Sequence, residues 1–78
     1  MKDFLLYLVK QLTDHPESVL VDEKEIDQQV VFTLTLDKED MGKVIGKEGK
    51  IIYAIRNLMK VRGIKEGLQV RVEIAESA

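Results

Sequence analysis

The stretch VIGKEGKIIYAI, residues 44–55, decides how this chain folds. Two glycines, Gly46 and Gly49, bracket Lys47 and Glu48, and apolar residues flank these four positions on both sides. Glycine adopts backbone angles that other residues resist, so GKEG predicts a sharp turn between two helices. Because glycines carry no side chain, the same turn leaves room for a ligand to approach the peptide backbone.

A short helix is expected before this turn and a longer helix after it. Asp37 has the character of an N-cap for residues 38–45, and Asp40 stands three residues later, as in a weak capping box. Residues 50–62 place apolar side chains at helical spacing, and Gly63 matches the glycine that ends many helices. The centre of the chain therefore predicts a helix, a GxxG turn and a second helix.

The remaining segments predict one further helix and three strands. Residues 4–12 carry an apolar stripe at helical spacing, and Pro16 follows where that helix must already have ended. Residues 18–26 and 30–37 read as an antiparallel hairpin, since the second run alternates apolar residues at a period of two. Residues 68–75 alternate in the same way and predict the last strand.

The predicted order, α-β-β-α-α-β, indicates an α+β fold, a two-layer sandwich with three helices on one face of a three-stranded sheet. Two helices precede the last strand, so this strand can pair parallel to the first strand through a crossover connection. The sheet is then mixed. A length of 78 residues predicts one domain that spans residues 1–78.

Charge is distributed unevenly along the chain. The net charge is −2 overall, but residues 1–42 carry −6 and residues 43–65 carry +6, with seven basic residues against Glu48 alone. A negatively charged partner would feel this basic segment, although a charge-rich helix can also be simply solvated. The absence of cysteine excludes disulfides and favours a reducing compartment, and the first twelve residues are too polar for a signal peptide. We expect a cytoplasmic protein.

The GKEG turn does not match the phosphate loops of nucleotide-dependent enzymes. A Walker A loop has four residues between its glycines, whereas three separate Gly42 from Gly46, and Glu48 stands after Lys47 where Ser or Thr is required. The sequence contains no GxGxxG fingerprint. The single histidine, His15, has no partner at a spacing typical of metal or catalytic sites. We therefore expect no enzyme activity, no cofactor and no metal site.

A GxxG turn offers a surface for a sugar-phosphate backbone. The N–H groups at the start of the second helix lie near the positive end of its dipole, and Lys47 adds charge. Ile45 and Ile52, the latter also part of the apolar helix stripe, flank the turn where a base can lie. Glu48 offsets part of the attraction, which predicts weak, salt-sensitive binding. The candidate nucleic-acid-binding residues are Lys43, Ile45, Gly46, Lys47, Glu48, Gly49, Lys50, Ile52 and Arg56, and for Arg56 simple solvation stays an alternative.

The longer pattern is more specific than the turn alone. VIGKEGKIIYAI resembles the V-I-G-x-x-G-x-x-I-x-x-I signature of the K homology (KH) domain, with matches at Val44, Ile45, Gly46, Gly49, Ile52 and Ile55. The order of elements resembles the type II KH fold, and nearly the whole chain is similar to the stand-alone bacterial KH-domain RNA-binding proteins of the KhpA family. The resemblance implies a groove for single-stranded RNA, in which the GxxG loop clamps the backbone of about four nucleotides.

The resemblance also implies partners and a role. Members of this family form dimers, with a second copy or with a second KH-domain RNA-binding protein, and act in post-transcriptional regulation or as an RNA chaperone. No membrane and no small-molecule substrate is implied. An alternative is an adapter that mainly binds its protein partner, with RNA contact secondary. A DNA-binding helix-turn-helix is less favoured, because strands flank the helix pair.

Overall fold

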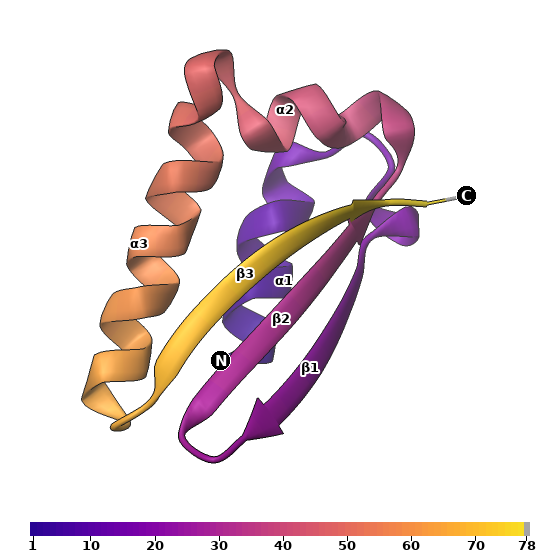
Figure 1. Cartoon of the computed structure of the whole chain (residues 1–78). Helices are drawn as coiled ribbons and strands as arrows, with labels where there is room; N and C mark the ends of the chain where they lie inside the picture. Colours follow the sequence, from indigo (N-terminus) through magenta and orange to yellow (C-terminus); the bar gives the residue numbers. More distant parts are fainter. Residues whose placement is uncertain (78) are drawn as a thin grey trace.

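The computed structural model describes residues 1–77 and confirms the predicted two-layer α+β sandwich (Figure 1). Three helices lie on one side of a three-stranded mixed sheet. Within residues 1–77 no helix is long and apolar enough to cross a membrane. The elements are α1 (Lys2–Leu12), β1 (Leu20–Ile26), β2 (Gln29–Leu36), α2 (Met41–Ile45), α3 (Lys50–Lys65) and β3 (Gln69–Glu76), with 3₁₀ turns at Pro16–Ser18, Lys38–Asp40 and Lys47–Gly49.

The strand order is β1-β2-β3, with β2 in the centre. β1 pairs antiparallel to β2, as expected for a hairpin, and β3 pairs parallel to β2. The predicted mixed sheet is therefore confirmed, but the expectation that the last strand pairs with the first was wrong. The inward face of β2 is more apolar than that of β1. This face is buried most completely when a strand lies on each side of β2, so β3 pairs with β2.

The inward face of β2 forms the centre of the core. Its residues Val30, Phe32, Leu34 and Leu36 are at most 1% exposed. Each such side chain contributes about 1.5–3 kcal/mol when it is fully buried. The apolar stripes predicted for the helices pack against this face, and they include Leu5 and Val9 of α1, Val44 of α2, and Ile52, Ile55 and Met59 of α3.

The end of α3 differs from the expectation. The helix continues past Gly63 to Lys65, and Gly67, with φ 70°, takes the position after the C-cap. Leu68 N–H donates to the carbonyl of Gly63 at 2.8 Å and Gly67 N–H donates to that of Ile64 at 3.2 Å, which is a Schellman motif. Gly63 is buried inside the helix, where a Cβ would collide with the Val70 side chain of β3 and lie 2.8 Å from the Leu68 carbonyl oxygen. Gly63 therefore allows α3 to approach β3 and does not end the helix.

This packing role gives a test with a matched control. We expect Gly63→Ala to lower the free energy of unfolding by about 1–3 kcal/mol, because the added methyl group collides with β3. Gly42→Ala in α2 should raise it by about 0.5–1 kcal/mol, since alanine favours helices. No atom lies within 4 Å of a Cβ at Gly42. Urea denaturation measures both changes, and a change of the same sign in both variants would contradict the assignment.

Candidate nucleic-acid interface

The GKEG turn joins α2 to α3 at one end of the sandwich (Figure 1). Gly46 has φ 77° and ψ 175°, a conformation that is essentially restricted to glycine. A Cβ at Gly46 would also lie 2.5 Å from the Ile51 side chain. Gly49 has φ 74°, but no atom lies within 4 Å of a Cβ built there. Gly46 is thus required by backbone angle and packing, whereas Gly49 leaves open space above the turn.

The tip of the turn exposes charges of both signs. Lys47, Glu48 and Lys50 are exposed, and none of them forms an ion pair with any residue from 1 to 77. Glu48 has φ 58° and ψ 24°, a left-handed conformation that costs a non-glycine residue about 1–2 kcal/mol. Gly49 is the N-cap of α3 and offers no side-chain acceptor to the first N–H groups of that helix. The first turn of α3 therefore has no side-chain cap, and Lys47 and Lys50 flank it.

Three predicted site residues, Lys43, Ile45 and Ile52, lie outside the exposed tip of the turn. The Lys43 ammonium forms an ion pair with Asp14 and lies 3.9 Å from Oδ1 of Asp40, so its charge is directed at the loop after α1. Ile52 is only 6% exposed and belongs to the core, while Ile45 is half-buried beside it. The structure brings together residues 46–50 of the predicted set.

A groove leads from the turn along α3. The Nε of Arg56 donates to the Val72 carbonyl of β3 at 3.1 Å, so this side chain bridges the helix and the sheet. Beside this bridge, Lys60 faces β3 across a hollow of about 430 Å³. A second hollow of about 400 Å³ lies next to the turn, and Asn57 borders both. Because β3 is an edge strand, its outer backbone groups face this groove without a neighbouring strand.

Asp40 has a role that the sequence analysis missed. The structure confirms Asp37 as a cap, since its Oδ1 accepts the N–H of Glu39 at 2.8 Å. Asp40 instead has a fully buried carboxylate, which accepts the N–H groups of Asp14 at 3.0 Å and His15 at 2.9 Å. Burial opposes ionisation, but the two backbone hydrogen bonds and the positive charges of His15 and Lys43 together outweigh it and lower the pKa of Asp40. Asp40 thereby ties the loop after α1 to the start of α2.

His15 has partners that its sequence spacing did not reveal. Its Nε2 lies 3.1 Å from Oε2 of Glu39, which is 24 residues away in the chain. This hydrogen bond raises the pKa of His15, against an opposing effect of desolvation. Ligand-type atoms of His15, Asp37 and Glu39 all lie within 4.8 Å of one another. The cluster strengthens the same connection that Asp40 makes between the two loops.

Acidification should weaken the Asp40 connection. A carboxylate with a lowered folded-state pKa stabilises the fold fully above its ordinary pKa of about 3.9, and this contribution is lost as pH falls through the folded-state pKa. We expect the melting temperature of the wild type to fall more steeply below about pH 4 than that of Asp40→Asn. The variant should melt lower at neutral pH, because an amide has one oxygen for two N–H donors.

Thermal denaturation followed by circular dichroism across this pH range measures both effects. His15→Gln is the control, because a raised histidine pKa has the opposite sign: its contribution is present below about pH 6.5 and is lost as pH rises. Parallel pH dependence of the wild type and Asp40→Asn below about pH 4 would contradict the role of Asp40.

A helix, a GxxG turn and a helix packed on a three-stranded mixed sheet, in the order α-β-β-α-α-β, define a type II KH domain. The model of the family described as KhpA/KhpB, KH domain, matches residues 2–74. The chain therefore belongs to the KhpA/KhpB KH-domain family, which confirms the resemblance inferred from the sequence.

Several bacterial relatives cover nearly the whole chain. The chain is 45% identical to the RNA-binding protein KhpA of Listeria monocytogenes serovar 1/2a, over 97% of this chain and 100% of the relative. It is 43% identical to the RNA-binding protein KhpA of Chlamydia caviae, over 97% of each chain. It is 45% identical to the protein of the same name from Clostridium perfringens, over 95% of this chain and 99% of the relative. No solved structure matches significantly.

Proposed function

We propose that this protein binds single-stranded RNA through the GxxG turn and the groove between α3 and β3. The observation that carries the proposal is the open space at Gly49, where α3 begins without a side-chain cap. A phosphate in this space accepts hydrogen bonds from helix N–H groups and lies beside Lys47 and Lys50. The names of the relatives, which are RNA-binding proteins, support the same ligand.

The distribution of charge shapes the expected binding. Lys60 and Arg71 border the groove beyond the turn and add to the attraction for phosphates. Glu48 opposes it, so binding is weak and falls as salt rises. Such a module acts without catalysis. We place it in the cytoplasm, in post-transcriptional regulation or as an RNA chaperone.

A variant with a more negative GxxG turn tests RNA binding. Replacement of Lys47 and Glu48 by Asp should abolish crosslinking to RNA in cells, because two carboxylates then face the phosphates. The circular dichroism spectrum should stay unchanged, since both side chains are exposed and Asp tolerates the left-handed conformation at position 48. Lys2→Asp, which makes the same change of charge at an exposed position of α1, should leave crosslinking intact.

A second variant tests the open space itself. Gly49→Asn fits the left-handed backbone and touches nothing, yet it places a side chain where the phosphate would lie. It should weaken RNA binding with only a small loss of stability, because Asn tolerates a backbone with φ 74° better than other side chains do. Full crosslinking by both loop variants would refute the proposal, and displacement of RNA by duplex DNA would favour a DNA-binding function instead.

A second function, the binding of a protein partner, is favoured by the outward face of α3. The side chains of Leu58 and Val61 on this face are 47% and 59% exposed. Exposed apolar patches of this kind mark interaction surfaces in soluble proteins. We infer that this face joins two copies of the chain or joins the chain to a second KH-domain protein, and the residues are Leu58 and Val61.

Charge on this face should separate the two copies. We expect Leu58→Glu combined with Val61→Glu to raise the dimer dissociation constant by more than about tenfold, because two carboxylates would be buried at the interface. Analytical ultracentrifugation measures the change. Tyr7→Glu is the matched control, since Tyr7 is 63% exposed on α1. A wild-type chain that sediments as a monomer at all concentrations would contradict self-association.

A further inference from the structure

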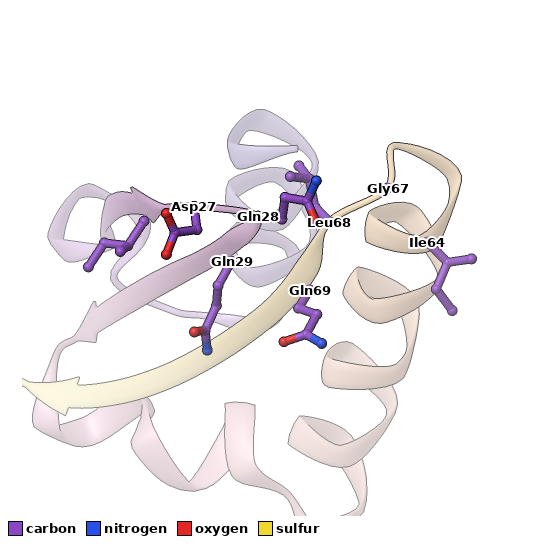
Figure 2. A pocket seen from close by; sticks show the side chains of 8 residues that line it. Asp27, Gln28, Gln29, Ile64, Gly67, Leu68 and Gln69 are labelled. Carbon is purple, nitrogen blue, oxygen red and sulfur yellow. The ribbon is translucent and has the colours of Figure 1, made fainter.

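A hollow of about 620 Å³ lies at the end of the sandwich opposite the GxxG turn (Figure 2). It forms where the β1–β2 turn meets the turn between α3 and β3. Three glutamines line it, namely Gln28, Gln29 and Gln69. Ile26 and Ile64 border it and are 68% and 70% exposed. Figure 2 shows the side chains of Gln29 and Gln69 next to one another on neighbouring strands, as their pairing in the parallel register requires.

The groove connects the GxxG turn to this hollow. Lys60 and Arg71 border the hollow beside Arg56 and also the next one along β3. Gln29 and Gln69 border that next hollow and the end hollow. The α3 helix rises about 21 Å over the 14 residues that separate the turn from the end hollow. An RNA strand bound at the GxxG turn can thus run along the groove past Lys60 and Arg71 to reach Gln29 and Gln69.

The chemistry of the end hollow suits a nucleobase better than a phosphate. A glutamine amide supplies two donors and one acceptor, the groups that base edges present. Within residues 1–77, the amides of Gln28, Gln29 and Gln69 form no hydrogen bond. Of the eight described residues that line the hollow, Asp27 alone is charged, and its carboxylate repels phosphate but accepts hydrogen bonds from base amino groups.

We propose that Gln29 and Gln69, with Gln28 at the rim of the hollow, form a nucleobase subsite, which binds a base of the same RNA strand that the GxxG turn holds. The paired side-chain amides of Gln29 and Gln69 offer donors and acceptors to the edge of that base. The subsite adds affinity for longer strands and a preference for the base at that position. This inference rests on the proposed binding of single-stranded RNA.

Fluorescence anisotropy with RNA oligonucleotides of about four and about ten nucleotides tests the subsite, because the turn alone spans about four. Gln29→Ala combined with Gln69→Ala should weaken binding of the longer RNA by about threefold to tenfold and leave the shorter RNA unaffected. The loop variant with Asp at positions 47 and 48 should lose both RNAs. Gln11→Ala, a glutamine exposed on α1, should change neither.

A substitution of the base at the far end of the longer RNA should change affinity for the wild type but not for the double variant. Gln29→Met combined with Gln69→Met keeps side-chain size and adds no charge if the alanine variant fails to fold. The proposal is overturned if these variants bind the longer RNA like the wild type, or weaken both lengths equally. It is also overturned if they change only sedimentation, which would indicate a protein partner. A wild type that binds neither RNA would instead refute the proposed function.

Discussion

Burial of the inward face of β2 is the constraint on which the rest of the structure depends. This strand holds four almost fully buried apolar residues, so it must be covered by helices and bordered by strands on both sides. β3 consequently takes the free edge next to β2, and α3 must run from the GxxG turn to the start of β3. The groove between α3 and β3 follows from this arrangement, because β3 has no neighbour on its outer side.

The α3 helix has three sides with different surroundings, namely the core, the groove beside β3 and the outward surface. One side packs Ile52, Ile55 and Met59 into the core, and the side toward β3 presents Lys60 to the groove. The outward side exposes Leu58 and other apolar residues. Since apolar residues occur on opposite sides, helical periodicity marks the helix but does not separate core residues from interface residues. Burial in the folded chain is needed to divide them.

Local patterns predicted the parts of this fold that depend on neighbouring residues. Alternation in residues 30–37 identified the central strand, and the glycine spacing identified the turn between two helices. The features that were missed depend on contacts distant in sequence. Gly63 and Gly67 both resemble helix ends, and only the approach of β3 distinguishes them. Asp40 resembles a local cap, yet its hydrogen bonds reach 25 and 26 residues back.

The ion pair of Lys43 with Asp14 bears on how much affinity for RNA the GxxG turn can supply. With Lys43 committed to Asp14 and Glu48 opposing Lys47, the turn offers little net positive charge. Helix N–H groups supply geometry there, but phosphate contacts alone give weak and salt-sensitive attachment. If the turn holds RNA as proposed, useful affinity must then come from contacts beyond it. Contacts along the groove would extend the proposed site on one chain. A second copy joined through α3 would add a second turn, which would raise the affinity through effective concentration without any new contact at the first turn.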